Sequence, residues 1–273
     1  MNATPKQDPE SIRDMVREGY AGIARGSGGC CGAATANRDA IARKIGYSEE
    51  DLEAVPAGAN LGLGCGNPID LARVRRGETV LDLGSGAGFD AFLAARIVGP
   101  EGSVVGVDMT PEMVSRAQQN ARAASATNVE FRLGHIEALP IDDESVDVVI
   151  SNCVINLSPE KDRVFREAWR VLRPGGRLAI SDLVLKAPFP VPLRSVEAYV
   201  GCIAGAMLRE DYLAAIRRAG FATVDVVAEA SFSGIVDLQS PEIHAALAAD
   251  GLTTADAEKL VENVVSLKVV ARK

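Results

Sequence analysis

Apolar residues follow two different spacings along the chain. From Ser11 to Ala24 they recur at helical intervals, and Ser11, which follows Pro9, is a candidate N-terminal cap. Beyond Glu78, short apolar runs alternate with amphipathic stretches of about ten to fifteen residues. This alternation predicts an α/β fold with a doubly wound, mostly parallel, Rossmann-like sheet.

The individual runs predict strands that alternate with helices, followed by two late strands. The first strands are expected at Val80–Leu83, Val104–Val107, Val129–Leu133, Val146–Ile150 and Arg177–Leu185. Helices are expected at Phe89–Val98, from Pro111 onward, and at Pro159–Leu172 before the stop signal Arg173-Pro-Gly-Gly176. Thr223–Ala228 and Val264–Ala271 predict a late antiparallel edge pair, and further helices are expected within Arg194–Ala206, Arg209–Ala219 and Pro241–Asn263.

Composition narrows the class of protein. The 273 residues are 47% hydrophobic and carry a formal net charge of −8, which is typical of a globular protein and excludes disorder. An acidic chain with 4% aromatic residues is a poor partner for nucleic acid. We find neither a membrane-length apolar stretch nor a signal-peptide core, so we expect a soluble cytoplasmic protein with no membrane partner.

A glycine-rich turn follows the first predicted strand. The sequence Val80-Leu-Asp-Leu-Gly-Ser-Gly-Ala-Gly88 places glycines where a ligand can approach the backbone at a helix N-terminus. A dinucleotide fingerprint would need a glycine where Phe89 stands. Asp108 ends the second strand, where a carboxylate can bind both ribose hydroxyls, and Met109 can pack on an adenine.

The stretch from about Gly77 to Leu185 resembles the class I S-adenosylmethionine-dependent methyltransferases. The resemblance implies that S-adenosylmethionine lies across the carboxyl ends of the first strands. The cofactor-binding residues implied in this way are Asp82, Gly84, Ser85, Gly86, Gly88, Asp108, Met109, Gly134, Ile136, Glu137 and Asn152. Of these, Asp108 would hold the ribose, and the segment Gly134-His-Ile-Glu137 would cover the adenine.

The five cysteines do not form a usual disulfide or zinc pattern. Their number is odd, no CxxC pair occurs, and only two histidines accompany them. Three lie in motifs that resemble those of the arsenite methyltransferases: Gly62-Leu-Gly-Cys-Gly-Asn-Pro68, Ser151-Asn-Cys-Val-Ile-Asn-Leu157 and Gly201-Cys-Ile-Ala-Gly-Ala206. The resemblance implies that Cys65, Cys153 and Cys202 hold trivalent arsenic as thiolates, a ligand type that suits a soft centre.

Cys30 and Cys31 lie in a glycine-rich segment where the arsenite methyltransferases carry a further cysteine. The resemblance implies a redox role: one of the two pairs with Cys65 after methyl transfer. Which of the two corresponds stays open. A thiol such as glutathione or thioredoxin would then restore the thiols, and arsenic could arrive as arsenite or as a thiol conjugate. Family members that carry further cysteines near the C-terminus differ from this chain, which has none after Cys202.

Two other functions remain possible from the sequence. The same sheet could serve a methyltransferase for a small organic acceptor, of the quinone-biosynthesis type, with incidental cysteines. The chain could also be a thiol-based arsenic sensor, although a sensor has no need of the glycine turn. We expect three regions: 1–76 as an N-terminal extension with Cys30, Cys31 and Cys65, 77–186 as the cofactor-binding domain, and 187–273 as a substrate-side region that completes the sheet.

Overall fold

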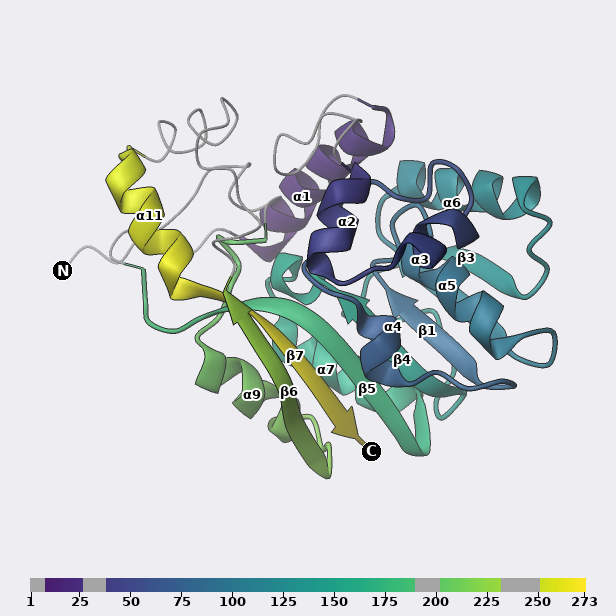
Figure 1. The fold of residues 1–273 in the computed structure, drawn as a ribbon. Coiled ribbons are helices and arrows are strands. Elements are labelled where there is room, and N and C mark those ends of the chain that lie inside the picture. The colour runs from purple at the N-terminus through teal and green to yellow at the C-terminus, as the bar shows by residue number, and fades with distance from the viewer. Residues whose placement is uncertain (1–7, 27–37, 190–201, 232–250) are drawn as a thin grey trace.

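The computed structural model describes residues 8–26, 38–189, 202–231 and 251–273 (Figure 1). Within these ranges, a seven-stranded sheet has the order β3-β2-β1-β4-β5-β7-β6. The strands are β1 (Thr79–Leu83), β2 (Ser103–Asp108), β3 (Val129–Leu133), β4 (Val146–Asn152), β5 (Leu172–Leu185), β6 (Thr223–Ser231) and β7 (Val264–Arg272). Strands β1 to β5 pair in parallel, whereas β7 runs antiparallel to both β5 and β6. The predicted α/β fold with a late antiparallel edge pair is therefore confirmed.

Helices cover both faces of the sheet. They are α1 (Pro9–Ala24), α2 (Arg38–Ile45), α3 (Glu49–Ala54), α4 (Pro68–Ala72), α5 (Phe89–Val98), α6 (Pro111–Ala123), α7 (Lys161–Val171), α9 (Arg209–Arg218) and α11 (Thr254–Asn263), with a 3-10 turn η2 (Ile155–Leu157). Helices α4, α5 and α6 share one buried apolar cluster with β1, β2 and β4. Helices α7 and α9 pack into a second cluster on the opposite face. No helix among the described residues is both long enough and apolar enough to cross a bilayer.

Two predicted boundaries were wrong. Helix α1 begins at Pro9 rather than Ser11, because the carboxylate of Asp8 caps it and accepts the Ser11 amide at 3.3 Å. Strand β5 begins at Leu172 rather than at Arg177, so it includes the residues 173–176 that were expected to end the preceding helix. There the backbone of Gly175 and Gly176 is hydrogen-bonded to Lys273 at the end of β7, so the glycines are held in the sheet.

Some predicted helices cannot be compared in full. Most of Arg194–Ala206 and the first part of Pro241–Asn263 lie outside the described residues. The described part of Pro241–Asn263 contains α11, which begins with a capping box formed by Thr253 and Asp256. Helices α2, α3 and α4 are short, and the sequence analysis did not assign them.

The strand order creates a crevice at one edge of the sheet. Strand β1 lies between β2 and β4, so the chain connections leave β1 and β4 toward opposite faces. In open α/β sheets, ligands bind at this switch point, outside the carboxyl ends of the strands. Helix α1 lies over this end of the sheet (Figure 1), and its Ile12 and Val16 are buried there.

Tyr47, which follows α2, connects the N-terminal helices to the sheet. Its hydroxyl donates to Asp90 Oδ1 at 2.6 Å and accepts from Asn152 Nδ2 at 3.0 Å. Its ring meets the Phe89 ring edge-on, with centroids 4.8 Å apart. A buried hydroxyl with both a donor and an acceptor partner fixes the orientation of the segment that carries it.

The first prediction concerns this hydroxyl. Tyr47→Phe removes one partner of two buried polar groups, Asp90 and Asn152, without changing the ring. We expect the free energy of unfolding to fall by about 1–3 kcal/mol, measured by chemical denaturation. The control is Ser103→Ala, which removes an exposed hydroxyl bonded to Thr79 at 3.4 Å and should change stability by less than about 0.5 kcal/mol. Equal effects of the two substitutions would contradict this role of Tyr47.

The second prediction concerns the buried carboxyl that Tyr47 contacts. Burial raises the pKa of Asp90 from 3.8 to about 6, against the opposing hydrogen bonds from Tyr47 and Asn152. The folded chain therefore binds the Asp90 proton more tightly than the unfolded chain does. This stabilisation is present below about pH 4 and is lost as the pH rises through about 6.

Asp90→Asn removes this titration. Between about pH 4 and pH 7, we expect the free energy of unfolding of the variant to rise by about 3 kcal/mol relative to the wild type. Denaturant titrations over this pH range measure the difference. Asp211→Asn, at an exposed position, is the matched control and should run parallel to the wild type. A difference for Asp90→Asn that does not vary with pH would contradict the prediction.

Candidate active site

A pocket opens at the carboxyl ends of β1, β2 and β4, beneath α1. Many of the residues expected from the sequence line it: Asp82, Gly84, Ser85, Gly86, Asp108, Met109, Ile136, Glu137, Asn152, Cys153 and Cys202. The lining also contains Arg13, Val16 and Tyr20 of α1, and residues 59–64 of the loop before α4. Segments that are far apart in the sequence therefore converge on one site.

The glycines of the turn between β1 and α5 have different tasks. Gly84, Gly86 and Gly88 all have positive φ angles, of 65°, 52° and 97°, which favour glycine. Around Gly86 a Cβ atom would meet nothing within 4 Å, so this position is open to the pocket, whereas at Gly84 it would overlap the side chain of Val154. At Gly88 a Cβ would lie 2.7 Å from both Phe131 and Phe92, so Gly88 allows close packing in the core rather than lining the pocket.

Gly134 also lies away from the pocket lining. A Cβ there would approach Pro140 at 2.8 Å and Val107 at 3.3 Å, so this glycine is packed against protein. Its neighbours Ile136 and Glu137 do line the pocket. Of the segment expected to cover an adenine, the second half therefore faces the pocket.

Three buried carboxyl groups surround the turn: Asp82, Asp90 and Asp108, with exposures of 3%, 7% and 8%. Burial raises the pKa of all three above their ordinary values, and the neighbouring carboxyls Asp90 and Asp108 raise that of Asp82 further. The carboxylate of Asp108 accepts the amides of Gly86 at 2.9 Å and Thr110 at 2.8 Å, which ties the turn to the end of β2. Such a concentration of acidic groups favours a ligand that carries positive charge.

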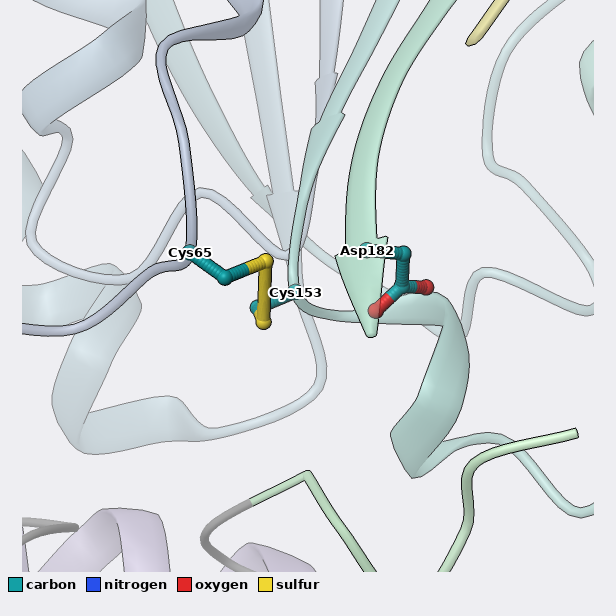
Figure 2. Close-up of side chains that lie close together, drawn as sticks. All are labelled: Cys65, Cys153 and Asp182. Carbon is teal, nitrogen blue, oxygen red and sulfur yellow. A yellow bond between two sulfur atoms is a disulfide. The ribbon is translucent and has the colours of Figure 1, made fainter. Parts of the chain in front are cut away.

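The cysteine side of the pocket is formed by three segments that are distant in sequence. A disulfide joins Cys65 to Cys153, which are 88 positions apart in sequence and have Cα atoms 5.8 Å apart (Figure 2). Cys202 is buried, and its thiol donates to the Cys153 carbonyl at 2.9 Å. Cys65 lies behind Cys153 rather than in the pocket lining, and its Sγ is 3.3 Å from the Ser181 carbonyl oxygen. The three cysteines belong to one apolar cluster with Ile12 and Val16 of α1.

Two of these cysteines have an unusual backbone. Cys153 and Cys202 have φ angles of 60° and 63°, in the left-handed region that non-glycine residues rarely adopt. The Cys153 amide donates to the Ser181 carbonyl at 2.8 Å, which holds the residue against β5. Strained backbone persists only where the surroundings impose it, and it is concentrated at functional sites.

A buried polar network lies behind the cysteines. Asp182 of β5 is fully buried and accepts the Tyr212 hydroxyl at 2.9 Å and the Leu183 amide at 3.0 Å. Burial raises the pKa of Asp182 to about 7, and the charge of Lys161 opposes the rise. Burial likewise lowers the pKa of Lys161 to about 8, and its Nζ donates to the carbonyl oxygens of Asn156 at 3.2 Å and Ser158 at 2.7 Å.

The sequence pattern predicted neither the buried network of Asp182, Tyr212 and Lys161 nor the contacts of α1. Arg13 forms ion pairs with Glu137, at 3.3 Å, and with Glu160. Tyr20 places its hydroxyl 4.0 Å from Cys202 Sγ. The helical pattern of Ser11–Ala24 predicted the helix but contained no signal for the surface that it covers. Cys30 and Cys31, expected near Cys65, lie outside the described residues.

Comparison with known proteins agrees with this geometry. A family profile described as a methyltransferase domain matches residues 74–220. The arsenite methyltransferase of Halobacterium salinarum is 54% identical over 235 residues, which are 81% of this chain and 60% of that protein. The arsenite methyltransferase of Homo sapiens is 35% identical over 175 residues, which are 60% of this chain and 46% of that protein. The chain thus spans about half the length of these curated relatives.

A solved structure shows the same relationship over a larger share of its chain. CrArsM, an arsenic(III) S-adenosylmethionine methyltransferase from Chlamydomonas reinhardtii, is 34% identical, with a TM-score of 0.60. The alignment covers 88% of this chain and 73% of that one. The chain therefore belongs to the methyltransferase domain family and, within it, to the arsenite methyltransferases.

Proposed function

We propose that this protein transfers the methyl group of S-adenosylmethionine to trivalent arsenic, which Cys65, Cys153 and Cys202 hold as thiolates. The observation that carries the proposal is the convergence of these three cysteines, from three separate segments, at the edge of the pocket that the glycine turn forms. The names of the relatives at 54% and 34% identity support the same substrate. The left-handed backbone of Cys153 and Cys202 supports a functional role for both.

The pocket residues fit the proposed cofactor. S-adenosylmethionine supplies an electrophilic methyl group on a positively charged sulfonium. The buried carboxyls of Asp82, Asp90 and Asp108 complement positive charge, and the open space at Gly86 admits a ligand against the backbone. We assign Asp108 to the ribose hydroxyls and Met109 to the adenine face, because both line the pocket at the end of β2.

Arsenic can bind only after the disulfide between Cys65 and Cys153 is reduced. Two molecules of an external thiol, such as glutathione, or one dithiol such as thioredoxin, become oxidised to a disulfide and leave two cysteine thiols. This requirement fits a reducing compartment such as the cytoplasm. We propose one of Cys30 and Cys31 as the residue that pairs with Cys65 after methyl transfer.

The thiols then exchange with the substrate. Arsenite, As(OH)₃, reacts with three cysteine thiols to form three As–S bonds and releases three waters. A thiol conjugate releases three thiols instead. Three sulfur ligands would leave a lone pair on arsenic, which would form the As–C bond as the methyl–sulfonium bond breaks and S-adenosylhomocysteine leaves. The methylated arsenic would then be pentavalent, and the two electrons released when Cys65 forms a disulfide with Cys30 or Cys31 would return it to the trivalent state. The protein contributes orientation, because Cys153 and Cys202 are fixed next to each other by the hydrogen bond at 2.9 Å.

The third prediction tests the activity itself. Incubation with arsenite, S-adenosylmethionine and excess thiol should yield methylated arsenic, separated and identified by chromatography. Omission of the thiol should stop turnover, because the Cys65–Cys153 disulfide then persists. Cofactor binding measured by titration, without any methylated product, would contradict the proposal and favour a small organic acceptor.

The fourth prediction separates arsenic capture from cofactor binding. Each of the single substitutions Cys65→Ser, Cys153→Ser and Cys202→Ser removes one sulfur ligand. The rate of arsenic methylation should therefore fall by about 100-fold or more in each variant, while cofactor binding is retained. The matched control is Asp108→Asn, which should weaken cofactor binding without changing the stoichiometry of arsenite bound to the reduced protein. Full activity of Cys153→Ser would contradict the three-thiolate mechanism.

A further inference from the structure

A carboxylate lies against the two cysteines that form the disulfide. One ligand atom each from Cys65, Cys153 and Asp182 lies within 4.8 Å of the others, and all three residues are buried. They come from the loop before α4, the end of β4 and strand β5 (Figure 2). The sulfur of Cys202, although it is described, is not part of this group.

Asp182 is held so that it can still accept a further ligand. One of its oxygens accepts the Leu183 amide and the other accepts the Tyr212 hydroxyl, at 3.0 and 2.9 Å. The backbone amide of Asn156 also donates to this carboxylate. A carboxylate has about four acceptor positions, so one remains open for a metal ion. Carboxylates that bind metal ions are usually oriented by such additional hydrogen bonds.

We infer that, in the reduced protein, Cys65, Cys153 and Asp182 bind one Zn²⁺ ion. Zinc accepts thiolate and carboxylate ligands together, and three protein ligands leave its fourth position for water. The ion displaces the two thiol protons, which pass to the buffer. Two thiolates and one carboxylate carry three negative charges; Zn²⁺ and the Lys161 ammonium, which interacts electrostatically with Asp182, together balance them.

This site overlaps the proposed arsenic site without being identical to it. Both use Cys65 and Cys153, but the third ligand is Asp182 for zinc and Cys202 for arsenic. Zinc does not have to present a lone pair to a methyl donor, so it does not need three sulfur ligands. It accepts a harder carboxylate oxygen as its third ligand. The inference depends only on the donor geometry and does not rest on arsenic methylation. Zinc should nevertheless compete with arsenite, because the two share sulfur ligands.

The fifth prediction is a zinc titration of the chain after reduction with a phosphine. The phosphine and one water molecule convert the disulfide into two thiols and a phosphine oxide. Cys30 and Cys31 are replaced by serine in every sample, so that they bind no zinc. Competition with a chromophoric chelator should give one Zn²⁺ per chain in the reduced state and none in the disulfide state. Asp182→Asn should weaken the affinity by about 10-fold or more, because loss of a residue that only orients a metal ligand already costs about that much.

Two controls make the test specific. Asp108→Asn removes another buried carboxyl, whose hydrogen-bond partners Gly86 and Thr110 lie outside the cysteine segments, and should leave zinc affinity unchanged. Cys202→Ser should also leave it unchanged, because Cys202 lies outside the group. Unchanged affinity in a folded Asp182→Asn variant, or zinc binding to the disulfide form that equals binding to the reduced form, would overturn the inference.

X-ray absorption at the zinc edge of the protein with Asp182 intact provides a second measurement that does not depend on the folding of a variant. Two sulfur scatterers with oxygen in the remaining positions would support the site. Three sulfur scatterers would overturn it, because Cys202 would then replace Asp182. Methylation of arsenite is scored separately, so failure of zinc binding and failure of the proposed function can be told apart.

Discussion

The side-chain amide of Asn152, the last residue of β4, connects the sheet to the segments that build the site. Its oxygen accepts the Cys65 amide at 3.0 Å, and its nitrogen donates to the Gly66 carbonyl at 2.8 Å and to Asp90 at 3.1 Å. One amide thus places the loop of Cys65 beside Cys153, the next residue in the chain. The same nitrogen reaches the Tyr47 hydroxyl, so the position of the first cysteine depends on how the N-terminal helices pack.

The left-handed backbone of the other two cysteines has a cost that the surrounding contacts must offset. Each such residue costs about 1–3 kcal/mol, which is a substantial fraction of a domain's stability. At Cys153 the stabilising contact is the hydrogen bond from its backbone amide to the Ser181 carbonyl. At Cys202 it is the hydrogen bond from the thiol to the Cys153 carbonyl. Close packing adds to this: a Cβ at Gly205 would overlap the carbonyl of Asn156. Gly205, three residues after Cys202, therefore allows the segment of Cys202 to approach the segment of Cys153.

The sequence was sufficient for the features that depend on local pattern. Alternating apolar runs predicted the parallel strands, and Pro111 correctly marked the first turn of α6. The glycine turn was visible because three glycines in five residues signal positive φ angles. What could not be seen was which side each residue faces: Gly88 belongs to the same motif as Gly86, yet the rings of Phe92 and Phe131 decide that it packs into the core.

Long-range contacts were not accessible in the same way. Asp182 stands in an apolar strand and reads as an isolated polar residue, and its partner Tyr212 follows 30 positions later. Helix α1 shows a clear apolar face, and that face packs against Cys65, Cys153 and Cys202. The last two of these cysteines are more than 100 residues away from α1 in sequence. Only the resemblance of three cysteine motifs to one family brought these segments together before the structure did.

The two halves of the pocket are electrostatically distinct, and this has a consequence for stability. Burial raises the pKa values of Asp82, Asp90 and Asp108, and the neighbouring carboxyls raise that of Asp82 further. A positively charged ligand would lower those pKa values and remove part of the cost of burying three acidic groups. Any ligand that binds the folded state alone stabilises it. Binding of the proposed cofactor would therefore be coupled to folding through the same carboxyls. In the described part of the thiol half, the carboxyl beside the cysteines is that of Asp182, and the proposed control there is oxidation of Cys65 and Cys153.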